Sequence, residues 1–277
     1  MKSWMHPKVR VIVFLSLANA AWITAMWLWV DHSWWMWITP IALSINFLLL
    51  TYDQVLTFTR LHSEPLVGHD AWGLLKTVLA LSESFQVEPP RLFLVSHPSA
   101  QVFCYGKSGR RTRLFVTEGL LKLLNPEELR AVLTFQLVAM NSSFNILNYW
   151  LGALIDLFFR VGRGLERAFA FVFGWAPPLA AWFVSPWTWL LHTTLLSPAD
   201  FAKLDRETAT RIDNPEDLAR ALWKMESYAQ TQPWTDAWVF AHMCMVSPLA
   251  FRHVLKALHV QPPLKGRIKR LVGRYPL

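Results

Sequence analysis

The sequence predicts an α+β protein, mainly α-helical, that combines a polytopic membrane part with a cytosolic domain containing a small β-sheet. Apolar residues make up 53% of the 277 residues and charged residues 17%, and 16 residues are Trp, which gathers at membrane interfaces. Two long apolar runs lie near the N-terminus. The rest of the chain contains capped amphipathic helices and two short segments of strand-like composition. It is long enough for a soluble domain of about 150 residues.

The charged residues and the cysteines exclude several classes of partner and site. The net charge is +8, but the Lys and Arg residues are scattered and several flank apolar runs, so a cytoplasmic membrane surface explains them better than nucleic acid. Cys104 and Cys244 are too few for a disulfide framework and lack the spacing of a metal site. We therefore expect a membrane partner, no nucleic acid and reduced thiols.

Residues 1–56 are predicted to form an N-terminal transmembrane hairpin. Residues 11–30 and 36–56 are apolar, and each run is long enough to cross about 30 Å of hydrocarbon. An A-x-A-like stretch at residues 18–20 leaves a cleaved signal peptide as the alternative, which the second apolar run disfavours. Early positive charge places the N-terminus inside. We expect a multi-pass protein of the inner (plasma) membrane, with its soluble part and both termini cytoplasmic.

Residues 57–143 are predicted to form the first part of the soluble domain. Apolar side chains repeat at helical spacing between Trp72 and Phe85. Residues 91–97 (RLFLVSH) and 111–117 (RTRLFVT) have the composition of strands. Residues 125–141 (NPEELRAVLTFQLVAMN) predict a helix in which the first residue, Asn, is the cap and the following Pro occupies the first helical position.

The second half of the chain is predicted to repeat this division into membrane and soluble parts. Residues 144–196 form a second membrane hairpin, with the basic stretch at residues 160–167 (RVGRGLER) as its loop. Three arginines in a loop that this topology places outside oppose the positive-inside rule. Residues 197–277 form a second, helical part of the soluble domain, in which Asn214 begins a helix that extends through Ala229.

The frame T-E-G-L-L-x-x-L-N-P-E-E-L-x-A-V-L, which begins at Thr117, resembles the active-site helix of the HtpX family of membrane zinc metalloproteases, relatives of the CAAX prenyl proteases. The resemblance implies a zincin-like fold for the cytosolic domain. In that family an H-E-x-x-H motif follows, in which two imidazoles bind zinc and the Glu is the general base. The corresponding positions here are Phe135, Gln136 and Ala139. A phenyl ring and a methyl group offer a metal no lone pair, and an amide does not accept a proton from water.

Three further stretches are similar to the same family. Residues 197–205 match R-x-x-E-F-x-A-D, which puts Asp200 at the third zinc-ligand position and Asp205 at the later acidic one. The role that we favour for Asp200 is to cap the following helix, for which Ser197 is another candidate. Residues 260–268 match T-H-P-P-L-x-x-R-I, with Gln261 in place of His. The third stretch resembles P-N-A-F-A-x-G, an edge strand beside the cleft, and supplies the candidate peptide-binding residues Gln101, Val102, Phe103, Cys104, Tyr105 and Gly106.

These substitutions predict an HtpX-like pseudoprotease that needs no zinc and that binds or regulates polypeptides or a partner protease at the membrane. Two alternatives remain open. The first is an active zinc metalloendopeptidase in membrane-protein quality control, for which zinc would be the cofactor. The second is a structural membrane component without a peptide groove.

Overall fold

The structure, a computed structural model, describes residues 63–68, 70, 72–106, 112–176, 198–234, 237, 240–248 and 261–273, with isolated positions at 13, 16, 20, 24 and 61. The predicted N-terminal hairpin and the part of the predicted second hairpin beyond residue 176 lie outside these described residues, apart from the isolated positions.

The strands form a four-stranded mixed sheet with the order β1-β2-β4-β3. The short β1 (Ser63–Pro65) runs antiparallel to β2 (Arg91–Val95), which pairs in parallel with β4 (Arg113–Thr117). Antiparallel pairing with β4 places β3 (Val102–Tyr105) at the edge. The two strands predicted from composition are confirmed as β2 and β4, and β3 is an edge strand as the resemblance implied. No signal in the sequence predicted β1.

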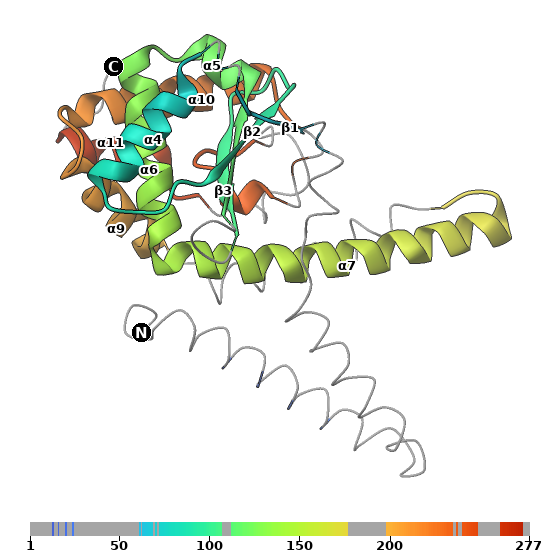
Figure 1. Cartoon of the computed structure of the whole chain (residues 1–277). Coiled ribbons are helices and arrows are strands. Elements are labelled where there is room, and N and C mark those ends of the chain that lie inside the picture. Colours follow the sequence, from blue (N-terminus) through green and yellow to red (C-terminus); the bar gives the residue numbers. More distant parts are fainter. Residues whose placement is uncertain are drawn as a thin grey trace.

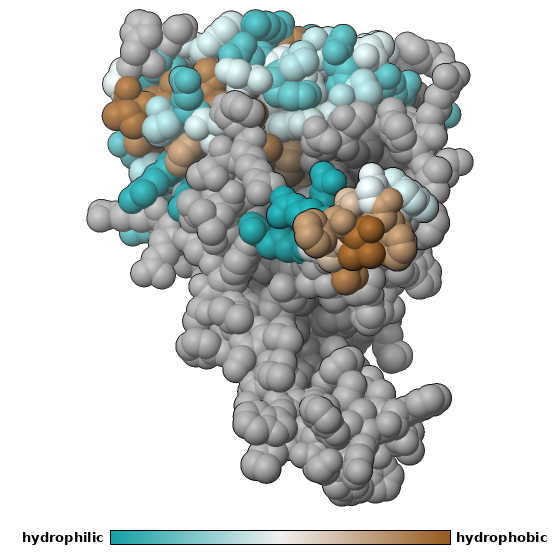
Figure 2. Space-filling model, turned by 90° about the vertical axis from the view of Figure 1, so that its right-hand side faces the viewer, coloured by the Kyte–Doolittle hydropathy of each residue, from teal (hydrophilic) through white to brown (hydrophobic). Residues whose placement is uncertain are grey.

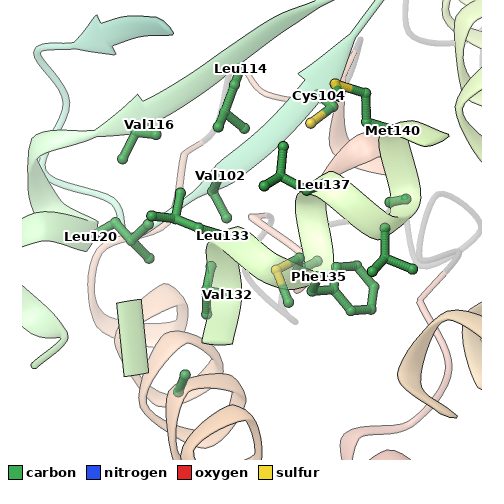
Figure 3. Close-up of a cluster of buried hydrophobic side chains, with 14 of the residues drawn as sticks. Val102, Cys104, Leu114, Val116, Leu120, Val132, Leu133, Phe135, Leu137 and Met140 are labelled. Carbon is green, nitrogen blue, oxygen red and sulfur yellow. The ribbon is translucent and has the colours of Figure 1, made fainter. Parts of the chain in front are cut away.

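Helix α6 (Pro126–Asn141) packs across one face of this sheet. The Asn125 side chain accepts a hydrogen bond from the backbone N–H of Glu128 at 2.8 Å, and the Glu128 carboxylate accepts one from the N–H of Asn125 at 3.1 Å. This reciprocal pair satisfies two donors that a helix start leaves open, so the predicted cap is confirmed. Leu133, Leu137 and Met140 point from α6 toward the strands (Figure 3).

The other helices surround α6 and close one hydrophobic core (Figure 1). Asn214 caps its helix as predicted, because its side chain accepts from the N–H of Glu216 at 3.1 Å. Buried residues from both predicted soluble parts share this core, so the two parts fold around each other. The helices are α4 (Leu74–Ser84), α5 (Glu118–Leu123), α9 (Pro198–Ala209), α10 (Pro215–Thr231) and α11 (Leu264–Val272). The short 3-10 helix η5 (Ala241–Met243) instead contributes to a second buried cluster, which includes side chains of β3.

Helix α7 (Ser143–Phe173) starts against the core and extends far beyond it (Figure 1). It continues without a break through residues 160–167, so the prediction of a loop there is wrong. The two flanking apolar stretches support helix on both sides, and the basic residues are compatible with it. Figure 2 shows a hydrophobic patch at the free end beside hydrophilic atoms, and Phe171 there is 92% exposed. Among the described residues, no helix is both long and apolar enough to cross a membrane.

Candidate functional site

The three residues at the H-E-x-x-H positions are all buried in α6. Phe135 and Gln136 are each 2% exposed and Ala139 is 5% exposed. Phe135 lies on the side of α6 away from Leu114 and Val116 of the sheet (Figure 3), whereas the amide of Gln136 reaches β3. The helix therefore presents these residues to protein rather than to solvent.

A buried arginine lies against Phe135. The Arg267 guanidinium carbon is 5.5 Å from the centroid of the Phe135 ring and 5.7 Å from that of Phe201, distances at which a cation interacts with a ring face. Its Nε and Nη2 donate to the two carboxylate oxygens of Asp205 at 3.0 and 2.7 Å, and its Nη1 donates to the carbonyl of Met245 at 2.7 Å. The side chains of the ion pair are only 1% and 2% exposed. Sequence reasoning missed Arg267 as a member of this site.

The acidic residue assigned to the third ligand position lies at the start of α9. Asp200 is in the first turn of that helix and is partly exposed. The helix begins at Pro198, so the prediction that Asp200 caps it is wrong. The next residue, Phe201, is 1% exposed and makes an edge contact with the ring of Phe144 at 4.9 Å between centroids. The guanidinium of Arg267 contacts the rings of both Phe135 and Phe201.

One spacing in the sequence could have pointed to Phe201. In the E-F-x-A-D pattern the Glu precedes the Asp by four residues, and Phe201 precedes Asp205 by the same number. If the pattern is aligned on the buried Asp205, its Glu falls at Phe201. If it is aligned on Ser197, its Glu falls at Asp200. The third-ligand role of Asp200 stays a prediction.

The donor chemistry of this site does not fit zinc. Tetrahedral zinc needs nitrogen, sulfur or carboxylate ligands, and Phe135, Ala139 and Phe201 supply none. Within the described part of the chain, no three His, Cys, Asp or Glu side chains come together as a metal site. The positive charge at this place is carried by a protein side chain, Arg267, balanced by Asp205.

Two side-chain amides hold the outer edge of β3. The backbone N–H of Thr117 donates to Gln101 at 3.1 Å, and because bonding alternates along an antiparallel pair, the carbonyl of Val102 faces away from β4. That carbonyl accepts from Nε2 of Gln136 at 3.2 Å, and the carbonyl of Gly106 accepts from Nδ2 of Asn145 at 2.8 Å.

The candidate peptide-binding residues 101–106 are all buried. A peptide that added to this edge as a further strand would have to displace the Gln136 amide from Val102. Binding at this strand stays a prediction.

Substitution of Gln136 by Glu is expected to destabilise the protein by about 1–3 kcal/mol, because an ionised carboxylate cannot donate to the Val102 carbonyl. Burial would raise the pKa of the new carboxyl. The folded state would then hold a proton that the unfolded state releases, so stability should fall as pH rises above about 4.3. Chemical denaturation at several pH values measures this. The control variant Gln136→Met should be less stable than the unmodified chain by the same amount at every pH. A Gln136→Glu variant whose stability did not depend on pH would contradict the hydrogen bond between Gln136 and Val102.

The segment around η5 carries a buried histidine packed on α7. Nε2 of His242 donates to the carbonyl of Asn148 at 3.2 Å. Burial lowers the pKa of His242 to about 4 from its ordinary 6.5, although the bond to Asn148 acts in the opposite direction. Burial also raises the pKa values of the Cys104 and Cys244 thiols, which keeps both protonated and unreactive.

We expect acid to weaken the fold through His242. His242 binds a proton below about pH 6.5 in the unfolded state but only below about pH 4 in the folded state. The stability that neutral His242 contributes is therefore complete above about pH 6.5 and is lost as the pH falls from about 6.5 to about 4. The free energy of unfolding should be about 1 kcal/mol lower at pH 5.5 than at pH 7.5. Denaturation curves at the two pH values test this, and the difference should shrink in a His242→Gln variant. An unchanged difference in that variant would assign the effect to other groups.

Comparison with known proteins finds similarity to a peptidase family and to proteins named HtpX homologues. Residues 74–135 match the model of peptidase family M48. The chain is 26% identical over 241 residues to a "Protease HtpX homolog" of Pelotomaculum thermopropionicum, covering 83% of this chain and 86% of that protein. It is 28% identical over 245 residues to the homologue of Sulfurovum sp., with the same two coverages.

Among solved structures, S. mikatae Ste24p matches with a TM-score of 0.45 and 13% identity, covering 94% of this chain and 65% of that one. The family model spans α4, β2, β3, β4, α5 and α6 up to Phe135, so it ends at the first of the three H-E-x-x-H positions. The sequence matches extend over most of the chain, as the resemblance predicted. By sequence, the chain is similar to HtpX homologues over most of its length, and one segment of it matches peptidase family M48.

Proposed function

We propose that this protein is a catalytically inactive, HtpX-like membrane protein that binds or regulates polypeptides or a partner protease. The observation that carries the proposal is the buried contact of Arg267 with Phe135 and Phe201. A guanidinium paired with Asp205 occupies the neighbourhood in which the family's helix would hold its ligands. Gln136, at the position of the general base, is committed as a donor to the β3 backbone. These contacts favour a scaffold role over hydrolysis.

The test of inactivity uses the full chain purified in detergent. After incubation with zinc and removal of unbound metal, we expect substoichiometric zinc by elemental analysis and no chelator-sensitive cleavage of casein. A HtpX homologue that has an intact H-E-x-x-H motif, treated identically, is the positive control. Stoichiometric zinc together with cleavage that EDTA abolishes would overturn the proposal in favour of an active metalloendopeptidase.

We further propose that the chain is a multi-pass protein of the inner membrane with a cytoplasmic soluble part and cytoplasmic termini. The relatives named HtpX support a membrane location, and the exposed end of α7 is consistent with one. Phe171, Phe173 and Trp175 there are 92%, 59% and 64% exposed. Aromatic side chains of this kind are stable at a bilayer interface. Resistance to carbonate extraction, and reporter fusions at each terminus that are active only in the cytoplasm, test this topology.

Polypeptide binding is proposed for the edge of β3, in competition with Gln136. A photoreactive residue introduced at Tyr105 should crosslink polypeptide in cells, and Gln136→Met should raise the yield because it frees the Val102 carbonyl. Absence of crosslinked polypeptide in both backgrounds would favour a structural membrane component.

A further inference from the structure

A cavity of about 550 Å³ lies between α10, the segment Met245–Ser247 and the start of α11. This volume is in the range of sites that hold small ligands or single side chains of a partner. Its walls include apolar side chains, among them Val246, Pro263 and Leu264. Neither the H-E-x-x-H positions nor the edge of β3 contribute to its lining.

Two hydrogen-bond acceptors belong to residues of the cavity wall and have no donor among the residues that the structure describes. Glu226 is half-buried and forms no hydrogen bond or ion pair within the described part of the chain. Oε1 of Gln261 is buried and has no hydrogen-bond partner among the described residues. The Nε2 group of the same amide is fully used, because it donates to the carbonyls of Ala241 at 2.6 Å and Cys244 at 3.0 Å. The orientation of the amide is thereby fixed, and its oxygen is enclosed within the cavity wall.

The cations near the cavity do not neutralise this pair of acceptors. Arg267 lines the cavity, but Nε, Nη1 and Nη2 already donate to Asp205 and Met245. Lys265 is exposed and has interactions of its own. Burial raises the pKa of the Glu226 carboxyl, and Arg267 offsets only part of that effect. A carboxylate in such surroundings gains from an additional positive charge.

An aromatic side chain lies one helical turn from the carboxylate. Trp223 precedes Glu226 by three residues on α10, so both point to the same side of the helix, and both line the cavity. The Trp223 side chain is 48% exposed, which leaves its indole accessible. Indole is the ring system that interacts most favourably with organic cations. The cavity thus combines a carboxylate, an indole and an apolar wall.

We propose that this cavity binds an organic cation, an ammonium or guanidinium group on an aliphatic stem, with the charge held by Glu226 and Trp223 and the stem against Val246, Pro263 and Leu264. Such a group occurs in the lysine and arginine side chains of a polypeptide and in free amines. The site is separate from the proposed loss of catalysis and stands whether or not the chain cleaves peptide bonds.

The experiment measures binding to the full chain in non-ionic detergent by fluorescence anisotropy. The probe is a labelled hexapeptide with one arginine among glycine and serine residues, and the control peptide carries citrulline, which keeps the shape without the charge. We expect saturable binding of the arginine peptide alone. Competition by N-acetyl-arginine amide distinguishes a small free cation from a polypeptide side chain as the ligand. If the amide competes as well as the unlabelled peptide, the site binds a free cation, and if it competes much more weakly, the site binds a polypeptide. Mass spectrometry confirms that the peptide stays intact.

Glu226→Gln should weaken binding about 10- to 100-fold, because it replaces a charged partner by a neutral one of the same shape. Trp223→Ala should weaken it about 3- to 5-fold. Glu207→Gln, which removes a more exposed carboxylate paired with Lys203 on α9, is the matched control and should leave the affinity unchanged. Equal binding of the arginine and citrulline peptides, an unaffected Glu226→Gln variant, or no binding of either the peptide or the amide would overturn the proposal.

Discussion

Replacement of Arg267 by methionine is expected to lower the free energy of unfolding by about 3–5 kcal/mol. The variant leaves the Asp205 carboxylate, which is 2% exposed, without its ion-pair partner in a place where water does not reach it. It also removes the donor to the Met245 carbonyl and the cation that lies against Phe135 and Phe201. Methionine fills most of the volume, so the effect reports the charge rather than a cavity. Denaturant titration of the purified chain in detergent measures it.

A surface pair provides the control for Arg267. Arg220 and Asp217 are hydrogen-bonded on α10, but the arginine side chain is 51% exposed, so Arg220→Met should cost less than about 1 kcal/mol. The double variant Arg267→Met with Asp205→Leu should recover more than half of the loss, because no buried charge then remains unpaired. If Arg267→Met were no more harmful than Arg220→Met, the buried ion pair would not be a main support of this core.

Gly119→Ala is expected to cost more than about 4 kcal/mol and to leave little folded protein. A Cβ atom at this position would lie 1.8 Å from the carbonyl oxygen of Pro98 and 2.9 Å from the carbonyl carbon of Ser99. Both are backbone atoms, and the N–H of Gly119 is itself bonded to the carbonyl of His97 at 3.1 Å. Neither α5 nor the segment after β2 can therefore move aside without losing hydrogen bonds. The yield of monodisperse protein and its thermal unfolding midpoint measure the effect.

Gly266→Ala in α11 is the matched control. A Cβ atom there would meet nothing within 4 Å, so the variant should be neutral or more stable by about 0.4–1 kcal/mol, as expected where alanine fits a helix. Equal behaviour of the two variants would show that the approach of Pro98 to Gly119 does not constrain the fold.

The sequence was most informative where the interacting residues are close together in the chain. The cap of α6 joins Asn125 to Glu128, and the cap of α10 joins Asn214 to Glu216. Both were predictable because a capping residue, a proline and an apolar period lie within a few positions. The T-E-G frame marked Gly119 as part of a pattern, but only the approach of Pro98 gives the physical reason for a glycine there.

The sequence was misleading where its local pattern was compatible with more than one structure. Residues 160–167 have no strong helix breaker other than Gly162 and Gly164, and the charge pattern that indicated a loop is equally compatible with the exposed face of α7. Asp200 has the chemistry of a cap, yet α9 starts earlier at Pro198. The strand β1 is too short to leave a periodic signal and forms because β2 offers an edge to pair with.

The sequence by itself determined the resemblance to the HtpX homologues, the capped helices, the two central strands and the absence of lone-pair donors at Phe135 and Ala139, since each of these depends on residue type and on near neighbours. Only the tertiary structure decided what surrounds those positions. Arg267 meets Asp205 across 62 residues, and Gln136 meets Val102 across 34, contacts that no local pattern encodes. The packing of α6 against the sheet, α9 and α11 brings them together, because a buried charge and a buried carbonyl are stable only where a partner is within hydrogen-bond reach.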